Sequence, residues 1–234
     1  MTGPADALDQ LIRRTRCLLL DFDGPICDIF AGHPAPTVAA QLRDLITAQG
    51  IELPADITHS GDPIVVFTYS GTISPGLAAK VEAEMADQEV AAVHAARPAP
   101  YVHDVVISAR ESGRSVGVVS NNSERAVRAY LDQHGLADRI DCIAARTSPD
   151  PALLKPNPHL LHQAITELAA APDECVLVGD QPTDMQAART TGIDSIGYAN
   201  KPGKTDTLAQ AGATAVVTSL AELVLPLRAR PLPN

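Results

Sequence analysis

A run of leucines that ends in two aspartates constrains the fold of this chain more than any other feature. Residues 18–20 are Leu-Leu-Leu, and Asp21-Phe22-Asp23-Gly24 follows directly. Such an apolar run is typical of a strand that is buried on both faces of a sheet. Two carboxylates at the end of that strand repel each other and lose solvation, so such a pair usually binds a metal ion or shares a proton during catalysis. The alternative is a turn in which Asp and Gly only satisfy loop backbone groups.

Two later strand ends carry polar residues of the same kind. Residues 116–119 form a short apolar run that ends in a Ser-Asn-Asn sequence beginning at Ser120, and residues 175–179 form another that ends at Asp180. The second run continues as Asp-Gln-Pro-Thr-Asp, which places a further acid at Asp184. In an open α/β sheet the ligand site lies outside the carboxyl ends of the strands. These strand ends are therefore predicted to meet in one crevice.

Lys155 lies between the second and third of these motifs, in the sequence Leu-Leu-Lys-Pro-Asn-Pro. A lone lysine is usually a solvated surface charge. Here Pro156 and Pro158 fix the surrounding loop and keep the lysine off a mobile helix face. This setting indicates a residue of the site.

Helix and strand patterns alternate along most of the chain, which predicts a parallel sheet with right-handed crossovers. A leading helix is expected at residues 5–14. Residues 205–225 add a helix, a short strand near residue 215 and a closing helix, and residues 226–234 are expected to be a loose tail. The alternating elements are helices at 101–112, 123–134, 158–170 and 183–191 and strands at 116–120, 140–144, 175–179 and 193–198.

A helical segment interrupts this alternation between two links rich in proline and alanine, residues 31–36 and 97–100. Three helices are expected within it. Thr37 opens the first, Asp62 or Pro63 opens the second, which carries Ile64, Val65, Phe67 and Tyr69, and Ser74-Pro75 opens the third. We interpret the segment as a lid over the crevice; the alternative is three ordinary helices packed on the sheet.

Composition limits the functions that the chain can have. The 234 residues carry a net charge of −10, which argues against nucleic acid as a partner. No apolar signal segment precedes Leu18 and no apolar run reaches membrane-spanning length. The four cysteines show no Cys-x-x-Cys spacing, which fits a reducing compartment. A soluble, cytoplasmic protein without a membrane partner is expected, and its oligomeric state is left open.

The ordered motifs resemble those of the haloacid dehalogenase-like (HAD) hydrolase superfamily, and within it phosphatases similar to phosphoglycolate phosphatase. The resemblance extends from about residue 17 to 200, and Pro25 departs from it because the family usually has Thr or Val there. It implies an α/β fold with a doubly wound, Rossmann-like parallel sheet and an inserted all-helical cap, with residues 1–30 and 99–234 as the catalytic core and 31–98 as the cap. The matching residues are Asp21, Asp23, Ser120, Lys155, Asp180 and Asp184.

Four acids in one crevice need a counter-charge. At ~4 Å and an effective dielectric of about 20, each pair of like charges costs roughly 4 kcal/mol. A site of oxygen ligands suits Mg²⁺. By resemblance, the metal ligands are the Asp21 side chain, the Asp23 backbone carbonyl and the Asp180 side chain, with Asp184 in or just behind that shell.

The resemblance also implies the activity, which is Mg²⁺-dependent hydrolysis of a small phosphorylated metabolite through an aspartyl-phosphate. Asp21 is then the nucleophile and Asp23 the general acid and base. Ser120, the Asn121 amide and Lys155 bind the phosphate. A haloacid dehalogenase is disfavoured by Asp23, and a phospho-accepting receiver domain by the order of the motifs. A phosphomutase of the same family and a non-catalytic phosphate-binding scaffold stay open. Candidate polar contacts to the substrate in the cap are His33, Arg43, His59, Tyr69 and Lys80.

Overall fold

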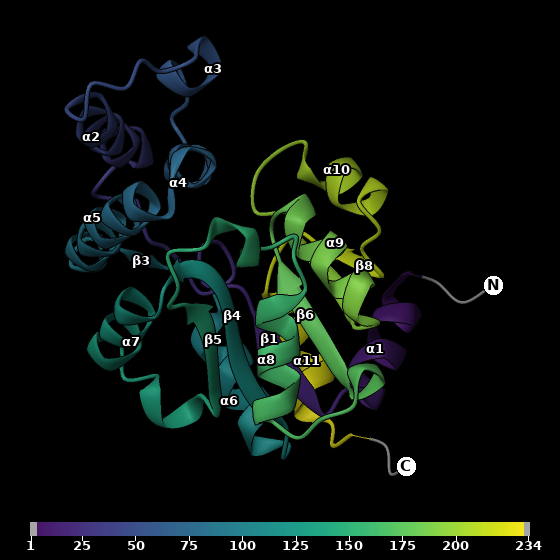
Figure 1. Cartoon of the computed structure of the whole chain (residues 1–234). Coiled ribbons are helices and arrows are strands. Elements are labelled where there is room, and N and C mark those ends of the chain that lie inside the picture. The colour runs from purple at the N-terminus through teal and green to yellow at the C-terminus, as the bar shows by residue number, and fades with distance from the viewer. Residues whose placement is uncertain (1–3, 232–234) are drawn as a thin grey trace.

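The computed structural model describes residues 4–231 and contains a six-stranded sheet in the order β5-β4-β1-β6-β7-β8, with every neighbouring pair parallel (Figure 1). Leu20 of β1 pairs with both Val118 and Val178, so β1 and its two neighbours, β4 and β6, are in register toward the same edge. That register places Asp21, Ser120 and Asp180 at one end of the sheet. The strands are β1 (Cys17–Leu20), β4 (Ser115–Ser123), β5 (Cys142–Arg146), β6 (Cys175–Gly179), β7 (Asp194–Tyr198) and β8 (Ala215–Val217).

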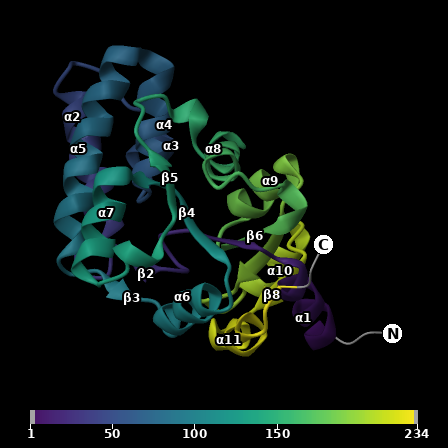
Figure 2. The ribbon, with the colours of Figure 1, turned by 90° about the horizontal axis from the view of Figure 1, so that it is seen from below.

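Helices cover both faces of the sheet, which confirms the doubly wound α/β fold expected from the sequence. Leu18 and Leu20 of β1 pack in the apolar cluster of one face, and Cys17 and Leu19 pack in that of the other. Figure 2 shows α1, α6 and α11 on one side and α8 and α9 on the other. The first face is covered by α1 (Pro4–Arg14), α6 (Val102–Glu111), α7 (Glu124–Gln133) and α11 (Ala221–Arg228), and the second by α8 (His159–Glu167) and α9 (Pro182–Thr191), while α10 (Lys204–Gln210) packs beside α9.

Four helices interrupt the core after β1 and stand to one side of the sheet (Figure 1). Two of them begin as their sequences indicate. Asp62 Oδ1 accepts a hydrogen bond from the Ile64 amide at 2.8 Å, and Ser74 Oγ accepts one from the Leu77 amide at 3.1 Å. On the third helix Val66 and Phe67 are buried, whereas Val65 is 39% exposed. The helices are α2 (Ala35–Thr47), α3 (Ala55–Thr58), α4 (Pro63–Ile73) and α5 (Pro75–Val93).

The chain just before the first link pairs with the second link, which the sequence did not predict. Strand β2 (Cys27–Asp28) pairs antiparallel with β3 (Arg97–Pro98), and the Ala99 amide donates to the Ile26 carbonyl at 2.9 Å. Ala92 and Val93, at the end of α5, belong to the main apolar cluster of the sheet. The last turn of α5 therefore packs with the core, and a cap boundary at residue 98 stays a prediction.

The first three residues of the expected loose tail, residues 226–228, lie in a helix. Helix α11 continues to Arg228, and Leu227 is fully buried. The buried guanidinium of Arg114 explains this, because it donates to the carbonyls of Leu227 at 2.9 Å and Ala229 at 2.8 Å. Residues 232–234 of the expected tail lie outside the described residues. Within the described chain, no helix has both the length and the apolar composition needed to cross a membrane.

Candidate active site

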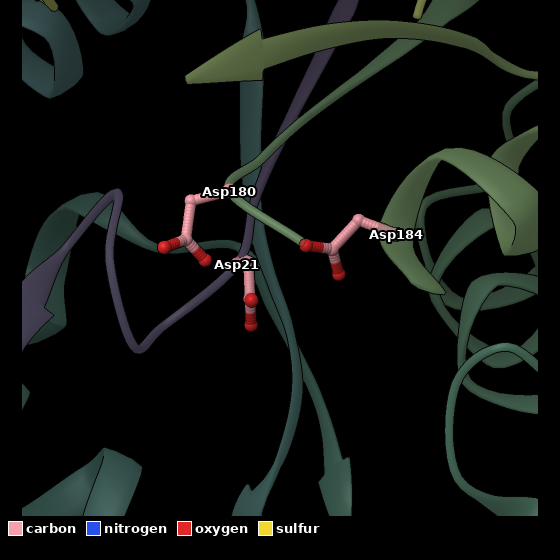
Figure 3. A group of neighbouring side chains, drawn as sticks. All are labelled: Asp21, Asp180 and Asp184. Atoms are coloured by element: carbon pink, nitrogen blue, oxygen red, sulfur yellow. The ribbon is translucent and has the colours of Figure 1, made fainter. Parts of the chain in front are cut away.

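Three aspartates converge at the carboxyl edge of the sheet (Figure 3). Carboxylate oxygens of Asp21, Asp180 and Asp184 lie within 4.8 Å of one another, and all three residues are buried. Asp21 follows β1, Asp180 follows β6, and Asp184 lies in the first turn of α9. A Cβ at Gly179 would lie only 2.4 Å from Cβ of Asp184, so this close approach requires glycine. The sequence motifs thus place three of the four predicted acids in one group.

The side chain of Asp23, the fourth acid, lies outside this group, although it lines the cavity described below. Its Oδ1 accepts a hydrogen bond from the Ile29 amide at 3.2 Å. Pro25 lies in the same turn, where the amides of Gly24, Ile26 and Cys27 donate the backbone hydrogen bonds. The turn forms without an N–H group at residue 25, so proline is compatible with this position. Burial raises the pKa of Asp23 to about 6, against the opposing effect of the Ile29 hydrogen bond.

Lys155 is buried between two of the clustered acids. Its Nζ lies 2.8 Å from Asp21 Oδ1 and 2.6 Å from Asp184 Oδ1, and it donates to the Val119 carbonyl at 3.0 Å. The side chain is 2% exposed. Asn121 holds the loop, since its Oδ1 accepts from the Lys155 amide at 2.8 Å and its Nδ2 donates to the Lys155 carbonyl at 3.2 Å. The predicted lysine is thus built into the acid cluster.

Ser120 is fully buried and hydrogen-bonded within its own loop. Its Oγ donates to Asn122 Oδ1 at 3.1 Å and accepts from the Asn122 amide at 3.0 Å. Asn121 and Asn122 line the cavity described below, whereas Ser120 lies behind that lining. The hydroxyl must turn from Asn122 in order to donate to a phosphate.

Burial and crowding determine the electrostatics of the cluster. Burial and then the Asp184 charge hold the pKa of Asp21 well above its ordinary value, against the effect of Lys155. Burial likewise raises the pKa of Asp180, although Lys204 opposes it. Burial lowers the pKa of Lys155, but the charges of Asp184 and Asp21 outweigh it and leave that pKa above its ordinary value. The site therefore favours additional positive charge.

The donor set fits a divalent cation. Asp180 Oδ2 accepts from Asn200 Nδ2 at 3.2 Å and pairs with the Lys204 ammonium, whereas its Oδ1 is buried and has no hydrogen-bond partner within residues 4–231. A Cβ at Gly24 would lie 2.5 Å from Cγ of Asp180, so the turn after β1 closes tightly over this carboxylate. Both oxygens of Asp184 are already occupied, by Lys155 and by the Gln181 amide at 3.0 Å. Asp21 and Asp180 are therefore the better direct ligands, with Asp184 behind them.

A cavity of about 410 Å³ opens above the cluster. Its wall combines strand-end residues with residues of the helical segment. None of the five candidate substrate contacts in the cap lies in the part of the wall that the structure describes; His33, for example, contacts Gln88 at 2.8 Å, and Arg43 donates to the Ser60 carbonyl. The lining includes Asp21, Asp23, Phe30, Lys155, Asn121, Asn122, Asp184, Gln181 and Thr183 from the core side and Ala35, Gly61, Asp62, Pro63, Ile64 and Glu89 from the helical segment.

Sequence reasoning missed two charged pairs at this edge. Lys204 pairs with Asp180, and Arg146 at the end of β5 pairs with Glu89 of α5 at 2.9 Å. Glu89 stands one helical turn after Met85, on the buried stripe of α5, and Arg146 ends the apolar run 142–145. The sequence signal for the second pair was a charged residue, Glu89 or Arg146, at a position where the apolar pattern predicts a buried side chain.

Comparison with known proteins agrees with this geometry. Residues 59–198, more than half of the chain, match the family model described as haloacid dehalogenase-like hydrolase. The chain therefore belongs to the haloacid dehalogenase-like hydrolases.

Curated relatives and solved structures extend the comparison. A phosphoglycolate phosphatase of Rhodospirillum rubrum is 35% identical over 116 residues, which are 47% of this chain and 45% of the relative. A phosphoglycolate phosphatase of Vibrio vulnificus (strain CMCP6) is 29% identical over 126 residues, which are 53% of this chain and 54% of the relative. The chain thus spans about half the length of these relatives. The crystal structure of CbbY from Rhodobacter sphaeroides in complex with phosphate matches with a TM-score of 0.67 at 20% identity, over 91% of this chain and 99% of that one, which shows the shared fold.

Proposed function

We propose that this protein is a Mg²⁺-dependent phosphatase that hydrolyses a small phosphate monoester through an aspartyl-phosphate. The observation that carries the proposal is the cluster of Asp21, Asp180 and Asp184 around the buried Lys155 ammonium. The phosphoglycolate phosphatases among its relatives and the phosphate complex of CbbY support a phosphorylated substrate.

Asp21 and Asp180 would hold the metal ion through their side chains and Asp23 through its backbone carbonyl, with Asp184 behind them. When bound, Mg²⁺ supplies positive charge that lets a phosphate approach the carboxylates. The unpartnered Oδ1 of Asp180 supports this assignment.

The chain's own residues would perform the chemistry in two steps. A carboxylate oxygen of Asp21 attacks phosphorus, the bond from phosphorus to the leaving oxygen breaks, and Asp23 protonates that oxygen so that it departs as the alcohol. Asp23 then takes a proton from a water that attacks the phosphorus of the aspartyl-phosphate and restores Asp21. Acid–base assistance of this kind typically contributes ~10²–10⁴ in rate. Lys155, Ser120 and the Asn121 amide would balance the charge of the transferring group.

Residues 31–98 are proposed to act as a lid that shapes the cavity, with 1–30 and 99–234 as the catalytic core. Closure of such a segment excludes water and helps to select the substrate. The segment supplies one wall of the cavity, which supports this role.

A phosphomutase of the same family is the second candidate, because it shares these core motifs. Another CbbY structure holds xylulose-(1,5)bisphosphate, so a related fold accommodates a sugar bisphosphate. Phosphate release measured over glycolate, sugar, nucleotide and polyol phosphates separates the two. A mutase requires a bisphosphate and shows little net release, and a non-catalytic scaffold releases none.

Removal of divalent cations is expected to abolish phosphate release, because the buried carboxylates then repel the phosphate. Addition of Mg²⁺ to the chelated protein should restore the activity, and the measurement is phosphate release from an aryl phosphate with and without excess chelator. Activity that is undiminished in excess chelator would contradict the metal assignment.

A further inference from the structure

A buried ion pair joins the helical segment to the sheet beside the candidate site. The side chains of Arg146, at the end of β5, and Glu89, on α5, are each 1% exposed, and Arg146 Nη2 lies 2.9 Å from Glu89 Oε2. Arg146 also donates through Nε to Glu82 at 3.1 Å, and its guanidinium carbon lies 5.7 Å from the centre of the Phe67 ring on α4. An ion pair this deeply buried persists when its remaining hydrogen-bonding groups are satisfied.

Those remaining groups are satisfied by the loop that contains Ser120. Arg146 Nη1 donates to the Asn121 carbonyl. Glu89 Oε2 accepts from the Ser123 amide at 2.7 Å, and Oε1 accepts from Asn122 Nδ2 at 3.1 Å. Residues 121–123 are thus hydrogen-bonded to one ion pair, whose arginine belongs to the sheet and whose glutamate belongs to α5.

The contact with Glu89 also fixes the orientation of the Asn122 side chain. A carboxylate only accepts hydrogen bonds, so the NH₂ group of Asn122 must face Glu89 and its oxygen must face away. That oxygen is the acceptor of the Ser120 hydroxyl. The Ser120 hydroxyl is therefore linked through the Asn122 side chain to a residue of α5.

We propose that Arg146 and Glu89 are positioning residues that couple the seating of α5 on the core to phosphate binding by the 120–123 loop. The proposal rests on the proposed function, since Ser120 and the Asn121 amide are its phosphate donors. A correctly seated α5 holds the loop that carries these donors, and the Ser120 hydroxyl then rotates from Asn122 Oδ1 toward a bound phosphate. By linkage, bound phosphate stabilises the seating of α5 to the same extent.

The test compares Glu89→Gln with Glu82→Gln. Both changes remove one carboxylate that pairs with Arg146, but only Glu89 contacts the loop. The probe is inorganic phosphate, measured as a competitive inhibitor of aryl phosphate hydrolysis with Mg²⁺ present. Glu89→Gln is expected to weaken phosphate inhibition by about 10-fold to 100-fold, which is the size of effect that a small displacement of a binding group produces. Glu82→Gln is expected to leave phosphate inhibition nearly unchanged.

Amide hydrogen exchange provides a second measurement, which a purely structural role would not change. Phosphate should slow exchange over residues 82–93 in the wild type and in Glu82→Gln, and should not do so in Glu89→Gln. If Glu89→Gln fails to fold, Arg146→Lys provides the second variant. Lysine keeps the positive charge but its side chain has one nitrogen, so it cannot bind both Asn121 and Glu89 as the guanidinium does. Arg146→Lys should therefore also weaken phosphate inhibition.

A lowered melting temperature with unchanged phosphate inhibition in Glu89→Gln, or equal weakening in Glu82→Gln, would overturn the coupling. A wild type that hydrolyses no phosphate ester and binds no phosphate would instead contradict the proposed function. The two failures are therefore distinguishable.

Discussion

Replacing Asp21 with asparagine is expected to lower kcat for phosphate monoesters by at least ~10⁴-fold, as the loss of a nucleophile does in other enzymes. An amide at this position cannot form the acyl-phosphate bond. The fold should survive, because asparagine has the same shape and Lys155 keeps its contact with Asp184 at 2.6 Å. The measurement is phosphate release together with thermal unfolding.

The matched control is Asp28→Asn, a change at an exposed acid seven residues further along the chain, which should retain wild-type kcat. Intact mass measurement must show that the asparagine introduced by Asp21→Asn has not deamidated back to aspartate. An Asp21→Asn protein that stays amidated and keeps a tenth of the wild-type kcat would rule out Asp21 as the nucleophile.

Replacing Lys155 with methionine is expected to affect both stability and activity. The buried ammonium is shared by Asp21 and Asp184, so its removal leaves two buried carboxylates without their cation. Breaking a buried pair in this way typically costs ~3–5 kcal/mol. We expect a loss of that size in the free energy of unfolding from urea titration, and a fall in kcat/KM of ~10²–10³ from the lost stabilisation of the transferring group.

Lys204→Met is the comparison for this change, because Lys204 pairs with Asp180 but is 20% exposed. Its loss of stability should be smaller, since water partly screens a pair whose lysine is partly exposed. Equal losses in the two variants, or a Lys155→Met protein as stable as the wild type, would contradict a central role for the buried lysine.

The ends of the strands could be located from the sequence, because a buried parallel strand restricts which residue types can occur along it. Leu18 to Leu20 are buried on both faces, and such strands read as continuous apolar runs that stop where polar residues begin. The helix starts at Asp62 and Ser74 were equally predictable, since capping is a local interaction between a side chain and the next turn.

Contacts between residues far apart in the sequence could not be predicted from local patterns. Arg146 and Glu89 are 57 residues apart, and the pairing of Cys27 with Pro98 depends on how the helical segment returns to the core. The sequence also did not reveal that the Asp23 side chain turns toward the Ile29 amide, because side-chain direction in a turn depends on which backbone donors are nearby. The convergence of the polar strand ends was thus predictable, while the contacts that hold the loops in place required the structure.

Rapid-quench mass spectrometry of Asp23→Asn should detect the aspartyl-phosphate itself. This variant keeps the nucleophile but lacks the acid and the base. With an aryl phosphate, whose leaving group needs little protonation, the first step should proceed in part, while the water of the second step lacks its base. A phosphoryl adduct should therefore accumulate on the tryptic peptide of residues 17–43 in Asp23→Asn and be absent in Asp21→Asn. An adduct on Ser120 or on a histidine, or no adduct in either variant, would contradict the mechanism.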